Sequence, residues 1–134
     1  MDNFTKEMVD YRLGCAKEDL EDAIYALNRK SLRASANRAY YSIFHSMRAV
    51  LALEQKDFKK HSAVLAYFNQ YYIKTNMFPS NLFELIRNAS VVREESDYMD
   101  LYVASFDKTN EQVESAKLIF DLVEKYINNL GVNK

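Results

Sequence analysis

The scarcity of chain-breaking residues is the feature that most constrains the fold. The 134 residues include only two glycines and one proline. Both residue types interrupt regular elements, so a chain almost without them is built from long segments. Apolar residues recur every three to four positions along most of the chain, which is the period of amphipathic helices. The sequence therefore predicts an all-α fold, an antiparallel up-and-down bundle of about five helices.

Capping residues mark the starts of the second and third of the first three predicted helices. The first covers about residues 4–28, with its acidic stretch, residues 18–22, on the face opposite the apolar stripe. The second begins at the candidate N-cap Ser31 and continues to about residue 54. Asp57 is the candidate N-cap of a third helix, which is expected to end near residue 74.

The last two helices follow a break at Pro79. The fourth is expected to begin at Ser80 or Asn81 and to end near residue 93, before a connection over residues 94–100. The fifth is expected to begin at a capping box formed by Thr109 and Gln112 and to stop at Gly131. No repeat or linker interrupts the chain, so residues 1–134 are expected to form one domain.

Neither a membrane span nor an export signal is visible in the sequence. No apolar run approaches the roughly 18 residues of a membrane-spanning helix, and no basic region precedes an apolar one at the start. The single cysteine, Cys15, lies in an amphipathic stretch, where a small buried side chain is expected. These features predict a cytoplasmic protein.

Positive charge is concentrated in one part of the chain. The formal net charge is −1, yet residues 29–61 carry eight Lys or Arg against two acidic residues, a local charge of +6. A positive segment of this kind can attract a polyanion such as RNA, even when the whole protein is nearly neutral. A solvated helix face with basic residues near its ends is the alternative.

Arg38 and His45 form the most suggestive pair in this segment. They stand seven residues apart, so two helical turns separate them and they share a face, with Tyr41 and Ser42 between them. Arginine offers a permanently charged fork for a phosphate, and histidine can carry a proton near neutral pH. A neutral histidine would deprotonate a ribose 2′-hydroxyl while the arginine stabilises charge on phosphorus, without a metal. Such a pair also arises by chance, as a histidine that only hydrogen-bonds a neighbouring helix.

Residues 37–51 are the most distinctive stretch of the sequence. They read Asn-Arg-Ala-Tyr-Tyr-Ser-Ile-Phe-His-Ser-Met-Arg-Ala-Val-Leu, and two further motifs follow, Lys60-His61-Ser62 and Arg93-x-x-x-Asp97-Tyr98. This order resembles that of the HEPN family (higher eukaryotes and prokaryotes nucleotide-binding). The resemblance extends over residues 5–130 and is greatest to small stand-alone prokaryotic members with the pattern Asn-Arg-Ala-Tyr-Tyr-x-x-Phe-His.

The resemblance implies an activity and partners. Many HEPN proteins are metal-independent ribonucleases with an Arg-x4–6-His motif, and six residues separate Arg38 from His45 here. Such enzymes act as homodimers whose two motifs meet across the interface. Many occur beside a minimal nucleotidyltransferase, either as toxin and antitoxin or as an accessory that binds a nucleotide or substrate.

Two positions depart from the family pattern. A polar residue commonly follows the motif arginine in the ribonuclease branches, whereas this chain has Ala39. Toxins that are modified by their partner transferase carry a tyrosine two residues after the motif histidine, where this chain has Met47. A non-catalytic accessory subunit therefore remains an alternative. A third possibility is structural, with Arg38 and His45 as inter-helix hydrogen-bonding groups in a dimer interface; full burial of both side chains against acidic residues such as Glu18, Asp19 or Asp22 would favour it.

The predicted site consists of two catalytic residues and a set of binding residues. Arg38 is expected to bind the phosphate and His45 to transfer the proton. The sequence lacks clustered metal ligands and a glycine-rich phosphate loop, so neither a metal nor a cofactor is predicted, and the expected ligand is RNA or a nucleotide. The predicted binding residues are Asn37, Tyr41, Ser42, Lys60, His61 and Arg93.

Overall fold

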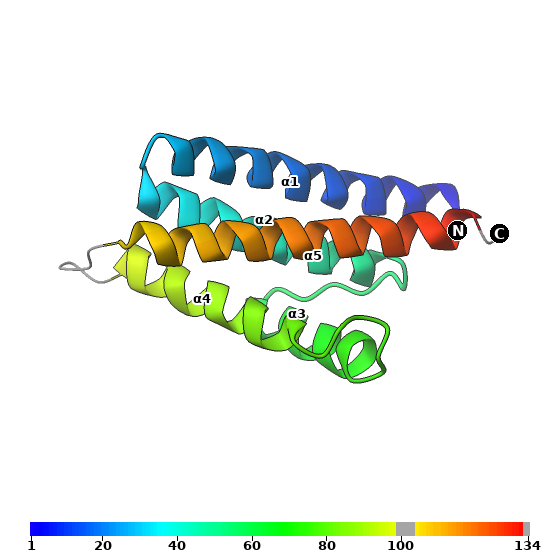
Figure 1. The fold of residues 1–134 in the computed structure, drawn as a ribbon. Helices are drawn as coiled ribbons and strands as arrows, with labels where there is room; N and C mark the ends of the chain where they lie inside the picture. The colour runs from blue at the N-terminus through cyan, green and yellow to red at the C-terminus, as the bar shows by residue number, and fades with distance from the viewer. Residues whose placement is uncertain (99–103, 133–134) are drawn as a thin grey trace.

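The computed structural model describes residues 1–98 and 104–132, which contain helices and no β-strand. α1 and α4 run opposite to α2 and α5, whereas α3 is seen almost end-on and so crosses the bundle (Figure 1). The predicted all-α bundle is confirmed. The helices are α1 (Asn3–Asn28), α2 (Leu32–Ala52), α3 (His61–Phe68), the π-helical turn η1 (Asn69–Ile73), α4 (Leu82–Tyr98) and α5 (Phe106–Val132).

α2 is the central helix and packs against α1, α3, α4 and α5. Its predicted apolar stripe is buried, with Ile43 and Met47 no more than 1% exposed. Between residues 37 and 48, the side chains that stay partly accessible all lie on one face of the helix. That open face is formed by Asn37, Arg38, Tyr41, His45 and Arg48.

Small residues allow α1 and α2 to approach closely. Ser35 and Ser42 of α2 are fully buried, and their hydroxyls donate to the carbonyl oxygens of Ala23 and Ala16, each at 2.8 Å. A buried hydroxyl without a partner would cost about 1–3 kcal/mol. Since the two acceptors are seven residues apart on α1, the two bonds fix the register of the helix pair.

The predicted start of the third helix is wrong. α3 begins at His61, with Lys60 in the N-cap position, and Asp57 does not cap it. The Asp57 carboxylate instead accepts hydrogen bonds from Arg48 and Arg12 and from the backbone N–H of Phe58. Hydrogen bonds from guanidinium groups are stronger than those from uncharged donors. Asp57 therefore pairs with the two arginines instead of capping α3.

α4 begins at Leu82, directly after the predicted Asn81, but continues to Tyr98. The expected connection is therefore wrong for residues 94–98, and residues 99 and 100 lie outside the described part of the chain. Asp97 explains the extension, because it pairs with Arg93 one turn back at 3.7 Å and accepts a hydrogen bond from Asn37 of α2.

The predicted ends of the fifth helix are also corrected. α5 begins at Phe106, three residues before Thr109, because Ser105 caps it: the Ser105 Oγ accepts from the Lys108 N–H at 3.3 Å. Gly131 does not end the helix, which continues to Val132. Without a left-handed backbone at Gly131, no glycine stop forms there.

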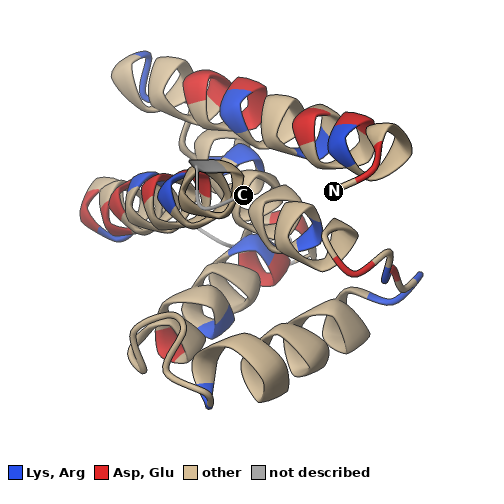
Figure 2. Cartoon of the chain, turned by 90° about the vertical axis from the view of Figure 1, so that its right-hand side faces the viewer, with Lys and Arg blue, Asp and Glu red and all other residues tan. Residues whose placement is uncertain are grey.

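Most charged side chains lie on the outer surface of the helices. Figure 2 shows acidic and basic residues interspersed along α1 and α5, whereas α3 and η1 carry none. Across residues 1–98 and 104–132, none of the helices has the length and apolar character required to cross a membrane. Cys15 is half-buried, not fully buried as expected, since it lies at the edge of the α1 stripe.

Candidate functional site

Arg38 and His45 meet at one carboxylate beside the open face of α2. The Nη1 of Arg38 donates to Oδ1 of Asp19 at 2.9 Å, and Nε2 of His45 lies 3.8 Å from Oδ2 of the same residue. Asp19 belongs to α1, and its side chain is only 13% exposed. The structure therefore brings the two predicted catalytic residues to a common point, which neither helix forms alone.

Asp19 was expected on the opposite face of α1, and this expectation is wrong. The buried residues of α1 recur at intervals of four and three, and position 19 continues this series. Glu18 and Asp22, on either side of the series, are exposed as expected. The position of Asp19 within this buried series was the sequence signal that its carboxylate lies on the buried side of α1. The series comprises Thr5, Val9, Arg12, Ala16, Ala23 and Ala26.

The environment keeps His45 neutral. Burial, followed by the charges of Arg48, Arg12 and Arg38, lowers the pKa of His45 to about 4. A neutral imidazole can accept a proton at physiological pH, as a general base must. Its Nδ1 is buried and has no hydrogen-bond partner, so the ring meets the open face through Nε2. Since the ring is uncharged, its 3.8 Å approach to Asp19 is not an ion pair.

Burial also affects the carboxylate itself. It raises the pKa of Asp19, an effect opposed by the charge and hydrogen bond of Arg38. Asp19 is thus a partly buried carboxylate whose charge depends on Arg38. Full burial of both Arg38 and His45 against such an acid would favour the purely structural alternative, but the Arg38 side chain is 39% exposed.

Hydrogen bonds hold Arg38 in place without using all of its N–H donors. Its Nε and Nη2 donate to Oδ1 of Asn37 at 3.0 and 2.7 Å, and its Nη1 donates to Asp19. Asn37 is fixed in turn, since its Nδ2 donates to Asp97 at 3.2 Å. These bonds leave one N–H on each terminal nitrogen of the guanidinium, both available to a phosphate oxygen.

Ser42 does not join the site. It stands four residues after Arg38, but the tilt of α2 against α1 turns it into the helix interface, where it is fully buried and bonded to Ala16. Tyr41 does lie on the open face, half-buried, with the Arg38 guanidinium 5.1 Å from its ring centroid. Lys60 is exposed immediately before α3.

Two further arginines belong to the surroundings of His45 and were not predicted. Arg48 donates to both carboxylate oxygens of Asp57 at 3.1 and 2.8 Å, and Arg12 donates to one of them at 3.2 Å. Arg12 is buried, and its Nε and Nη1 have no partner. Its place on the buried stripe of α1 was the signal that sequence reasoning missed.

His61 of α3 and Arg93 of α4 lie around Tyr40 and also border Tyr41 of the open face, at 5.8 and 5.9 Å from its ring centroid. The Tyr40 hydroxyl lies 2.9 Å from Nδ1 of His61, and the Arg93 guanidinium stacks 4.7 Å from the Tyr40 ring centroid. Arg93 also forms an ion pair with Asp97, at 3.7 Å. Among residues 1–98 and 104–132, no three or more His, Cys, Asp or Glu side chains are placed to hold a metal ion.

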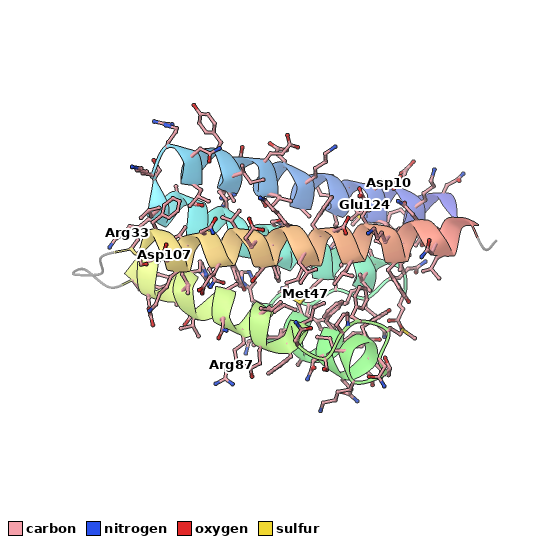
Figure 3. All side chains as sticks on the ribbon, viewed as in Figure 1. Asp10, Arg33, Met47, Arg87, Asp107 and Glu124 are labelled. Carbon is pink, nitrogen blue, oxygen red and sulfur yellow. The ribbon has the colours of Figure 1, made fainter. Side chains whose placement is uncertain are left out.

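A pocket of about 200 Å³ lies between α2, α3 and α4. Met47 and Ile86 form part of its apolar lining, and Tyr40, His61 and Arg93 add polar groups. Figure 3 shows Met47 directed into the bundle, whereas Arg87 of α4 points outward. The position where some relatives carry a tyrosine is thus buried in this chain, with Met47 only 1% exposed.

Comparisons with known proteins identify the family. The model of the HEPN domain matches residues 9–126. A UPF0332 protein of Thermotoga maritima is 30% identical over 128 residues, covering 96% of this chain and 97% of that protein. Two proteins of Methanocaldococcus jannaschii, each named "Putative toxin", are 28% identical over 119 and 130 residues, covering 89% and 93% of this chain and 81% and 92% of theirs. The chain belongs to the HEPN domain family.

Proposed function

We propose that this protein is a metal-independent RNA endonuclease that acts as a homodimer and is paired with a minimal nucleotidyltransferase in a toxin–antitoxin system. The observation that carries the proposal is the meeting of Arg38 and a neutral His45 at one carboxylate beside an open helix face. The "Putative toxin" names of two relatives are consistent with the toxin–antitoxin part.

In this mechanism His45 is the proton acceptor. Its accessible Nε2 takes the proton of a ribose 2′-hydroxyl, and the resulting oxyanion attacks the adjacent phosphorus. The free N–H groups of Arg38 bind the non-bridging phosphate oxygens and stabilise the charge that develops there. Asp19 holds the Arg38 guanidinium and faces Nε2, so it also stabilises the imidazolium that forms when His45 accepts the proton.

The activity is tested by RNA cleavage with purified Arg38→Ala and His45→Ala variants. Each should lose about 10²–10⁴-fold in rate, the usual contribution of a positioned proton-transfer or charge-stabilising group. Arg29→Ala is the matched control, because it removes the same charge from the same basic segment at an exposed site outside this cluster. A chelator should leave the rate unchanged. Equal cleavage by all three variants would exclude this site.

The homodimer rests on the family resemblance and is tested separately. Light scattering of the purified protein should give twice the 15.7 kDa mass of one chain. A single-chain mass at micromolar concentration would contradict the proposal that two Arg38–His45 pairs meet across an interface. Co-purification with the product of a neighbouring nucleotidyltransferase gene tests the second partner.

The pocket between α2, α3 and α4 supports a second candidate function. An apolar lining with a few polar groups is typical of small-molecule sites, and Arg93 supplies a positive charge at this one. The protein would then be a non-catalytic accessory that binds a nucleotide or substrate for its nucleotidyltransferase. Calorimetry should detect nucleotide binding that Arg93→Ala weakens, with no RNA turnover. Binding that Arg93→Ala leaves unchanged would contradict this candidate.

A further inference from the structure

His61 is a second imidazole next to His45, although it comes from a different helix. The ring centroid of Phe44 lies 5.6 Å from that of His45 and 4.0 Å from that of His61. Tyr41 also lies near both imidazoles, at 6.3 and 5.8 Å. The two histidines therefore border the same aromatic pair on the open side of α2.

A buried hydroxyl orients the His61 ring. Tyr40 is only 3% exposed, and burial raises the pKa of its hydroxyl, which therefore remains protonated and donates to Nδ1 of His61. In the neutral ring this hydrogen bond places the proton on Nε2, the nitrogen on the far side; in the protonated ring Nδ1–H donates to the Tyr40 oxygen instead. An imidazole that is fixed through one nitrogen and free at the other has the arrangement of an acid–base group.

His61 also lines an open hollow that contains two cationic side chains and one carboxylate. This open hollow contains Arg48 and Lys59 together with Asp57, next to the rings of Phe44 and Phe58. A phosphodiester that reached Arg38 and His45 could extend toward this hollow, because Phe44 lines it and also contacts His45. Its cationic side chains attract the RNA backbone.

We propose that His61 is the general acid of RNA cleavage, with His45 as the base; this role rests on the proposed function. His45 takes the 2′-hydroxyl proton, the bond from the 2′-oxygen to phosphorus forms, and the bond from phosphorus to the 5′-oxygen breaks. The electron pair of the broken bond goes to the 5′-oxygen, which receives the Nε2 proton of the His61 imidazolium. The products are a 2′,3′-cyclic phosphate and a 5′-hydroxyl, and proton exchange with water restores both histidines.

The two histidines differ in their surroundings. Burial and three arginines strongly depress the pKa of His45, which favours the neutral base. The pKa of His61 is lowered as well, by burial, Arg93 and Arg48, but its ring is bordered by an open hollow. A bound phosphate would favour the charged form of an imidazole at this border, because opposite charges attract.

The experiment compares two RNA substrates of the same sequence. One is unmodified, and in the other the 5′-bridging oxygen at the cleavage site is replaced by sulfur, which leaves without needing a proton. The variant is His61→Asn, whose side chain can still accept the Tyr40 hydrogen bond but cannot act as an acid. It should cleave unmodified RNA about 10²–10⁴-fold more slowly than the native protein and the sulfur-containing RNA at a nearly native rate. His45→Ala should be slow on both substrates.

The outcomes separate this role from the proposed function. Equal loss by His61→Asn on both substrates, or no loss on unmodified RNA, overturns the role of His61 and leaves the endonuclease proposal intact. A native protein that cleaves neither substrate overturns the endonuclease proposal and this role with it. If His61→Asn is shown by circular dichroism to be misfolded, His61→Gln replaces it in the same comparison, with the same two outcomes decisive.

Discussion

Replacing Asp57 by asparagine should destabilise the protein, because this carboxylate neutralises a buried cation. Asp57 pairs with Arg12 and Arg48, and the side chain of Arg12 is only 9% exposed while that of Asp57 is 44% exposed. Two nitrogens of Arg12 already lack partners, so the Asp57→Asn variant would leave its charge uncompensated in the interior. The connection between α2 and α3 would also lose its ion pairs to α1 and α2.

The magnitude lies between those of a buried and an exposed ion pair. Removing one partner of a fully buried pair costs about 3–5 kcal/mol, whereas exposed pairs contribute about 0–1 kcal/mol. Because water reaches Asp57 but hardly reaches Arg12, we expect Asp57→Asn to lower the free energy of unfolding by about 2 kcal/mol. With a urea dependence of about 1.5 kcal/mol per molar, the unfolding midpoint should fall by about 1.3 M.

The pH dependence of this loss gives a second check. The hydrogen bond from Arg48, followed by that from Arg12, holds the pKa of Asp57 well below the ordinary value of an aspartate. A depressed carboxyl pKa stabilises the folded state above the unfolded pKa, and this contribution is lost as the pH falls toward the folded one. The difference between native protein and Asp57→Asn should therefore be constant from pH 7 to about pH 5 and shrink below about pH 4.

Urea unfolding followed by circular dichroism measures these changes. The matched control is Glu114→Gln, which breaks the exposed 3.1 Å pair with Lys117 and should cost less than about 0.5 kcal/mol. The double variant Arg12→Met/Asp57→Asn should be more stable than Asp57→Asn alone, because it leaves no buried charge. A loss no larger than that of the control, or a double variant less stable than Asp57→Asn, would refute this reasoning.

Three further predictions concern the site and its support. Ser42→Ala should cost about 1 kcal/mol in the same unfolding assay, because its buried hydroxyl donates to Ala16; an unchanged midpoint would contradict this. The His45 ring should titrate near pH 4 by NMR, and stability should fall as the pH drops from about 6.5 to about 4, since the unfolded chain binds the proton first. A His45 midpoint above pH 6 would exclude the buried neutral ring. Asp19→Asn should lower kcat more than it raises KM, because it removes the charge that stabilises the imidazolium; the reverse pattern would indicate a role in binding.

Helical periodicity accounts for what could be predicted locally. The apolar repeat placed Ile43 and Met47 in the core, and the seven-residue interval placed Arg38 and His45 on one face. Both properties depend only on the geometry of one helix, so no distant residue can alter them once the helix forms. The family resemblance rested on this stretch of α2 together with the motifs at residues 60–62 and 93–98, and it is confirmed by the match to residues 9–126.

The wrong predictions for helix ends concern polar residues that have two possible partners. Asp57 has a side chain suited to an N-cap, but Arg12, which is 45 residues distant in sequence, binds it together with Arg48. Asp97 was placed in a connection, yet the last turn of α4 persists because Asn37, 60 residues away, donates to it. Such ion pairs and hydrogen bonds form only after the helices have packed, so local sequence cannot rank them against a cap or a turn.

By itself, the sequence determined that the chain forms long helices, which of them carries the Arg38–His45 motif, and to which family it belongs. The packing of the helices placed Asp19 against this motif and brought His61 of α3 against Phe44 of α2. The physical reason is that the apolar period fixes which residues share a helix face. The rotation and crossing of packed helices decide which polar groups on different helices come within hydrogen-bonding distance.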